Sequence, residues 1–106
     1  MIECTLPVDE RPRRAAEFDG LFAAAVRSVE RPQPTLARME LEAEPRIAAQ
    51  AADLITRETD CCSFFTFVLT ATGGGLRLDV EVPAAHVGAI DGLVARATRA
   101  ARLRHT

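Results

Sequence analysis

Two neighbouring thiols are the residues of this sequence that could most directly do chemistry. Cys61 and Cys62 stand side by side in TRETDCCSFFTF, residues 56–67, and the third cysteine is Cys4. Adjacent cysteines rarely close a disulfide on each other, because the peptide between them would be strained. Both can instead reach one large soft ion, since thiolates select soft metals such as Cu(I) and Zn(II) and their heavier relatives. The pair therefore predicts a soft-metal or metalloid site with Cys61 and Cys62 as ligands and Cys4 as a candidate third ligand.

The charge expected around the pair favours a bound cation over a free nucleophile. An apolar stripe at helical spacing starts near residue 44 or 45 and reaches the cysteines, so they are expected where that helix ends. A helix C-terminus carries about −0.5 of an elementary charge, which disfavours a bare thiolate and favours a cation. Reactive cysteines usually lie at the opposite end of a helix. Glu58 and Asp60 add negative charge nearby, so we expect binding rather than catalysis.

Two other interpretations of the thiols stay open. Free cysteine is among the most buried residue types, so the pair could be inert core in a non-catalytic interaction or oligomerisation module. Alternatively, the chain is a thiol redox protein in which one cysteine of the pair is attacked and Cys4 resolves the intermediate. The C-x-x-C pairs of zinc ribbons are missing from the sequence, which disfavours a structural zinc site.

Glu58 and His86 are further ionisable candidates for the site. Glu58 continues the apolar stripe of the helix that carries the cysteines, and a carboxylate there needs a partner. We expect that partner to be an arginine, which disfavours Glu58 as an oxygen ligand. His86 stands at the start of the last expected helix, where a solvated side chain is the expectation.

The composition disfavours several classes of function. All thirteen basic residues are arginine, so the sequence offers no lysine for a Schiff base or a Walker-type phosphate loop. The net charge of −2 disfavours nucleic acid as a partner. No signal peptide is visible, and no apolar run approaches the roughly 20 residues that span a bilayer. The chain is therefore expected to be cytoplasmic, without a membrane partner.

The hydrophobic periodicity predicts a single α+β domain over residues 1–106. Strands are expected over residues 1–6, 35–42, 64–70 and 76–82, and helices over residues 9–29, from about 44 to 62, and over 84–103. This βαβαββα order predicts a two-layer sandwich, with a four-stranded mixed sheet and the helices on one face. The polar sheet face or a sheet edge is expected to support a homodimer.

One segment resembles sequences that bind metal elsewhere. RETDCCSFFTFVLT and LRLDVEVP, within residues 57–83, resemble the cysteine-pair segment of small bacterial proteins and of some metal-responsive regulators of the MerR type. The resemblance implies sensing, binding or sequestration of a thiophilic ion by Cys61 and Cys62. Cys4 lies outside the matched segment. The winged-helix DNA-binding region of those regulators is absent from this sequence, so it is not expected to regulate transcription alone.

Overall fold

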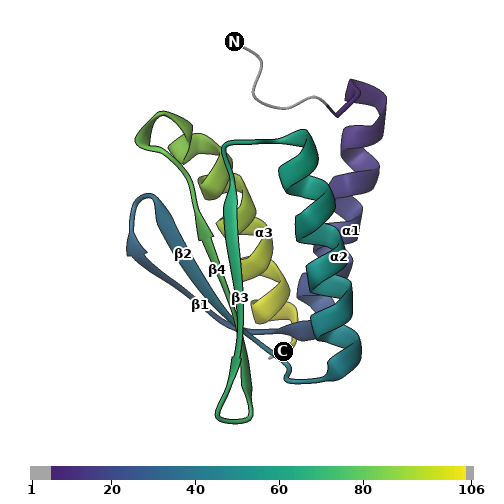
Figure 1. Cartoon of the computed structure of the whole chain (residues 1–106), viewed down its shortest axis with the longest axis vertical. Helices are drawn as coiled ribbons and strands as arrows, with labels where there is room; N and C mark the ends of the chain where they lie inside the picture. The colour runs from purple at the N-terminus through teal and green to yellow at the C-terminus, as the bar shows by residue number, and fades with distance from the viewer. Residues whose placement is uncertain (1–5, 105–106) are drawn as a thin grey trace.

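The protein is an α+β structure with three α-helices and a four-stranded antiparallel sheet in the part that the computed structural model describes, residues 6–104 (Figure 1). In chain order the elements are η1 (Val8–Glu10), α1 (Arg11–Ala25), β1 (Val26–Gln33), β2 (Leu36–Leu41), α2 (Pro45–Cys61), β3 (Thr66–Thr72), β4 (Gly75–Glu81), η2 (Ala84–His86) and α3 (Val87–Arg104). No helix within this part combines the length and apolar character that crossing a bilayer requires.

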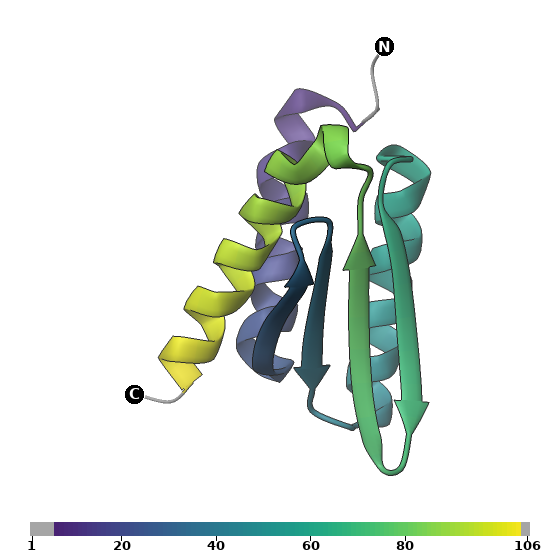
Figure 2. The ribbon, with the colours of Figure 1, turned by 90° about the vertical axis from the view of Figure 1, so that its left-hand side faces the viewer.

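The sheet has the strand order β1-β2-β4-β3, and all three pairings are antiparallel. The expected mixed sheet is therefore wrong for the described strands. Tight hairpins join β1 to β2 and β3 to β4, and such short connections permit only antiparallel pairing. The expected strand over residues 1–6 falls almost entirely outside the described residues. Figure 2 shows β1 and β3 at opposite edges of the sheet, with α1 and α2 behind it.

The strand β1 corrects the helix expected over residues 9–29, because α1 ends at Ala25. Val26 and Val29 match helical spacing and also suit a strand, since β-branched side chains pack well on a pleated surface. Pairing with β2 decides between the two, with Val26 opposite Leu41 and Val29 opposite Met39. The described order is thus αββαββα, in which an αββ unit occurs twice before α3.

The second helix, α2, follows the expected pattern closely. It begins at Pro45, whose missing N–H costs nothing in the first turn. Ile47, Ala51 and Leu54 are its buried residues, and they recur at three- and four-residue intervals. The helix ends at Cys61, with Cys62 as its C-cap, so both thiols lie at the helix end as expected.

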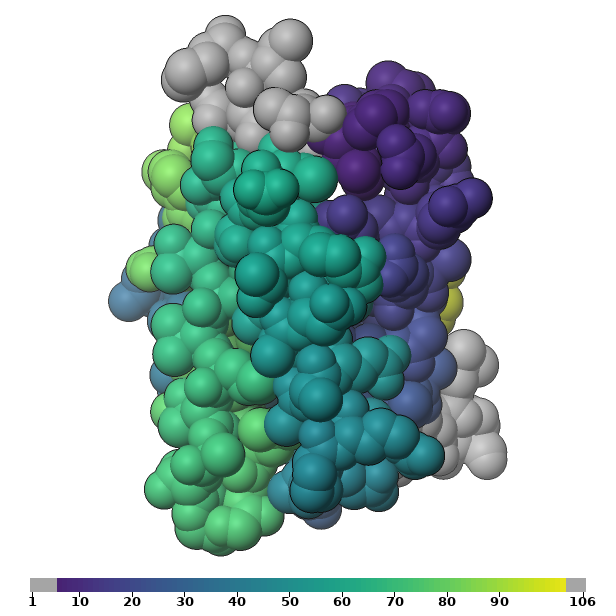
Figure 3. Space-filling view, turned by 45° about the vertical axis from the view of Figure 1, so that its right-hand side comes forward, coloured from purple at the N-terminus to yellow at the C-terminus, as the bar shows by residue number. Residues whose placement is uncertain are grey.

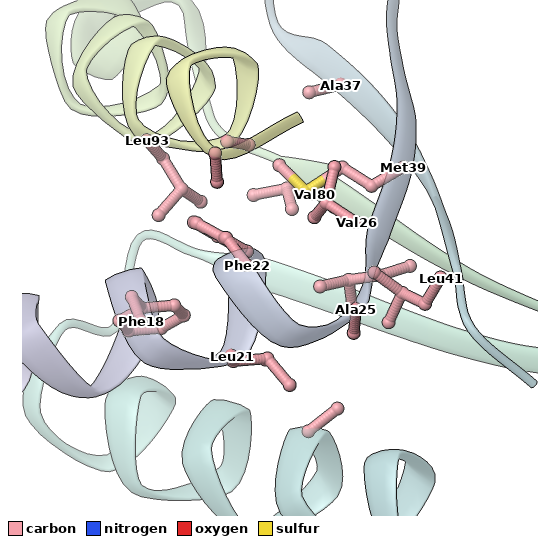
Figure 4. Close-up of a cluster of buried hydrophobic side chains, with 14 of the residues drawn as sticks. Phe18, Leu21, Phe22, Ala25, Val26, Ala37, Met39, Leu41, Val80 and Leu93 are labelled. Carbon is pink, nitrogen blue, oxygen red and sulfur yellow. The ribbon is translucent and has the colours of Figure 1, made fainter. Parts of the chain in front are cut away.

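The core lies between the helices and the inner face of the sheet. Alternate residues of β2 and β4 are buried there, as the sequence predicts, while the residues between them face outward. Figure 4 shows Phe22 from α1, Leu93 from α3 and Met39 from β2 in the same cluster. These contacts fix α1 and α3 on the sheet, and α2 packs beside them against β3.

Candidate functional site

The cysteine pair occupies the turn between α2 and β3. Cys61 is the last helical residue and is half-buried, whereas Cys62 is only 4% exposed. The backbone of Cys62 is extended, with φ −122° and ψ 90°, and its N–H donates a 2.7 Å hydrogen bond to the carbonyl oxygen of Glu58. The Phe65 N–H then donates to the Cys62 carbonyl oxygen at 3.3 Å. These bonds fix the backbone of Cys62 on both sides.

Cys62 is buried without belonging to the main hydrophobic cluster of the described residues. Its exposure of only 4% suits a packed core cysteine, so the packed-core interpretation stays open. The Cys62 sulfur is disulfide-bonded in this structure. Cys4, the candidate third ligand, lies outside the described residues.

Glu58 has the arginine partner that the sequence predicts. Arg14 of α1 donates a 2.7 Å hydrogen bond to Glu58 Oε1, and the two side chains are only 13% and 12% exposed. The prediction of an arginine partner is thus confirmed. A carboxylate held in this way is neutralised by its partner, which leaves the metal proposal to the sulfurs.

Arg57, the other arginine near the pair, is also occupied by carboxylates. It donates to both carboxylate oxygens of Glu17, at 2.6 and 3.2 Å, and to Asp53 at 2.9 and 3.1 Å. The hydrogen bond from Arg57 lowers the pKa of Glu17, and the same carboxylates raise the pKa of Arg57 above its ordinary value. Stabilisation of a thiolate at the helix end by Arg57 would require breaking these contacts.

A continuous series of aromatic rings runs from the cysteine turn into the core. Neighbouring rings have centroids 4.3 to 6.4 Å apart, in the order His86, Phe64, Phe65, Phe67, Phe18 and Phe22. The His86 and Phe64 rings are nearly parallel, with an interplanar angle of 8°. His86 is therefore half-buried against Phe64 rather than fully solvated. No pattern in the sequence indicates this pairing, because the two residues meet only through the tertiary fold.

The described side chains do not complete a metal site by themselves. Within residues 6–102, no group of three or more His, Cys, Asp or Glu side chains is arranged to hold an ion. Cys61 and Cys62 are brought together by their adjacency, and a third protein ligand would have to come from outside this part of the chain.

Comparison of the chain with protein-family models, with curated proteins and with solved structures finds no match. The resemblance of residues 57–83 to MerR-type segments therefore stays a prediction.

Proposed function

We propose that this protein, once the disulfide at Cys62 is reduced, binds a soft metal or metalloid ion through the thiolates of Cys61 and Cys62, with Cys4 as the third ligand. The observation that carries the proposal is the position of the pair, as the last residue and the C-cap of α2. Carbonyl oxygens at a helix C-terminus lack intrahelical N–H partners and carry partial negative charge. An ion bound there meets a favourable field and displaces the thiol protons itself.

The charges around the helix end support a cation at this position. Arg14 and Arg57 are both engaged by carboxylates, at Glu58 and at Glu17 with Asp53. The exposed Asp60 lies one residue before the pair and adds a negative charge. A cation gains from this environment, whereas a free thiolate would be repelled by it.

The third ligand, Cys4, depends on where residues 1–6 lie relative to α2. We propose that residues 1–6 reach back to the C-terminal end of α2 and bring Cys4 to the cysteine pair. Three thiolates would give a site for ions that favour sulfur ligands, such as As(III) and Hg(II).

The disulfide at Cys62 favours a second candidate function, thiol redox chemistry. In that case, the thiols of Cys62 and Cys4 would give up two protons and two electrons to a disulfide of a partner protein. The two sulfurs of that partner disulfide would leave as two thiols. The position of the pair disfavours this chemistry, because a helix C-terminus does not stabilise the attacking thiolate. A structural disulfide of low potential would also produce the observed bond without any catalytic role.

Metal titration after reduction tests the first candidate. The protein is reduced, freed of reductant under nitrogen, and titrated with As(III) or Hg(II) while ultraviolet charge-transfer absorbance is followed. The proposal expects bands that saturate at one ion per chain and are lost in Cys61→Ser and in Cys62→Ser. Ser63→Ala, at an exposed neighbouring position, is the matched control and should keep them. Absence of bands at stoichiometric metal would contradict the proposal.

The redox candidate has a separate readout. Equilibration of the protein with glutathione buffers gives the reduction potential of the Cys62 disulfide. A potential near about −200 mV would support redox exchange, because it is close to the potentials of known thiol oxidoreductases. A potential below about −300 mV would mark the bond as structural.

A further inference from the structure

The two edges of the sheet differ sharply in how they are protected from pairing with another strand. The strand β1 contains Arg27, Glu30, Arg31 and Pro32, and its register with β2 shifts at two places. Charges, proline and irregular register are the features by which proteins keep edge strands from pairing with another chain. This edge is therefore built to stay unpaired.

The opposite edge, β3, has none of these features. Its sequence, TFVLTAT, has no charged residue, no proline and no glycine, and its register with β4 is regular from Thr66 to Thr72. Within the described strands, β3 pairs only with β4, so alternate N–H and C=O groups point away from the sheet. A regular and uncharged edge of this kind is a template for another strand.

The side chains of β3 also leave apolar surface exposed. Val68, on the outer face, is 50% exposed, although most large apolar residues of the described chain are covered. Phe67 and Leu69 turn toward the core, yet both remain partly exposed at the sheet edge. Figure 3 shows β3, in green, at the surface beside α2.

We propose that β3 pairs with β3 of a second copy of this chain, antiparallel, about a two-fold axis at Leu69. The two four-stranded sheets would then join into one continuous sheet across the dimer. In this register, Thr66 lies opposite Thr72, Val68 opposite Thr70, and Phe67 opposite Ala71, with Leu69 opposite its own symmetry mate.

The composition of β3 fits this register better than it fits a charged or dissimilar partner strand. On the inner face, the large Phe67 meets the small Ala71, so the edge can close without a clash. On the outer face, Thr66 pairs with Thr72, which is a favourable cross-strand pair, and Val68 is covered by Thr70. The strand is neutral throughout, so two copies approach without repulsion between like charges. A two-fold interface of this kind requires a self-complementary patch, and this strand provides one.

Two charge variants at the outer face test the proposed pairing under reducing conditions. The double variant Val68→Lys with Thr70→Lys places a lysine at position 68 of each copy directly opposite a lysine at position 70 of the other. Repulsion between these ammonium groups should convert the dimer to a monomer. Val68→Lys with Thr70→Glu places opposite charges there and should stay a dimer. Ser28→Lys, on the exposed face of β1, controls for added charge and should also stay a dimer. Sedimentation equilibrium gives the mass, and far-ultraviolet circular dichroism checks the fold.

Amide hydrogen exchange provides a second measurement on the unmodified chain. Pairing at β3 should slow exchange at alternate β3 amides as protein concentration rises, while the amides of β1 remain unaffected. A chain that stays monomeric up to about 1 mM would overturn the proposal. A dimer that survives the paired lysine substitutions, or that protects β1 instead, would overturn it equally.

Discussion

Arg14→Met is expected to destabilise the protein more than a typical surface substitution. Arg14 links α1 to the last turns of α2 through its 2.7 Å hydrogen bond to Glu58, and both side chains are largely buried. Methionine keeps much of the aliphatic stem, so the variant isolates the loss of charge from the loss of packing. Glu58 would then be left as a carboxylate that is 12% exposed, without its cation.

The size of the effect follows from the burial of the pair. A hydrogen bond to a charged group contributes about 1.5–3 kcal/mol, and breaking a fully buried ion pair costs about 3–5 kcal/mol. With side-chain exposures of 13% and 12%, the pair lies between a surface and a buried pair. The 3.9 Å contact of Arg14 with Glu17 adds little, because exposed pairs contribute less than about 1 kcal/mol. We therefore expect a loss of about 2–3 kcal/mol, or about 10 °C in Tm.

A double-mutant cycle measured by urea unfolding separates this interaction from other effects. Arg14→Met combined with Glu58→Met removes both charges, so no unpaired carboxylate remains, and the double variant should cost clearly less than the sum of the single variants. A coupling energy of about 2 kcal/mol is expected. Arg46→Met, at an exposed position near the start of α2, is the control and should change stability by less than about 0.5 kcal/mol. Additive single effects, or a loss below about 0.5 kcal/mol for Arg14→Met, would refute the reasoning.

Three further outcomes follow from the structure. The hydrogen bond from Arg57 lowers the pKa of Glu17 below 4.5. The folding stability that Glu17 contributes is therefore present above its unfolded-state pKa and is lost as the pH falls through its lower folded-state pKa. The urea midpoint of Glu17→Gln should therefore fall less steeply with pH below about pH 4.5 than that of the unmodified protein. Equal slopes of midpoint against pH in the two proteins would contradict this. Gly74→Ala, at φ 80°, should cost about 1 kcal/mol in thermal unfolding, whereas Gly75→Ala, which has ordinary φ, should cost less. Met39→Ala, at a fully buried position, should cost about 2–5 kcal/mol in urea unfolding, and a near-neutral result would contradict the core assignment.

The elements with a single strong periodicity could be predicted from the sequence. β4 alternates apolar and charged residues without interruption, and α2 carries its apolar stripe up to the cysteines. The helix-end position of Cys61 and Cys62 followed from that stripe. These predictions succeed because local pattern and tertiary packing require the same structure.

The sequence-based prediction is wrong where one pattern of apolar residues suits both a helix and a strand. Val26 and Val29 suit both a helix and a strand, so only pairing with β2 reveals where α1 ends. The burial of Glu58 indicated an arginine partner, but not that it would be Arg14, which is 44 residues away in the chain. The stacking of His86 on Phe64 likewise depends on how η2 meets the cysteine turn, which no local spacing determines.

X-ray absorption spectroscopy of the As(III)-loaded, reduced protein tests the proposed soft-metal site most directly. It counts the sulfur atoms bonded to arsenic, independently of any change in stability. The proposal predicts three sulfurs, from Cys61, Cys62 and Cys4, and two in Cys4→Ser. Arsenic that binds without sulfur neighbours, or a reduced protein that retains no arsenic after desalting, would contradict it.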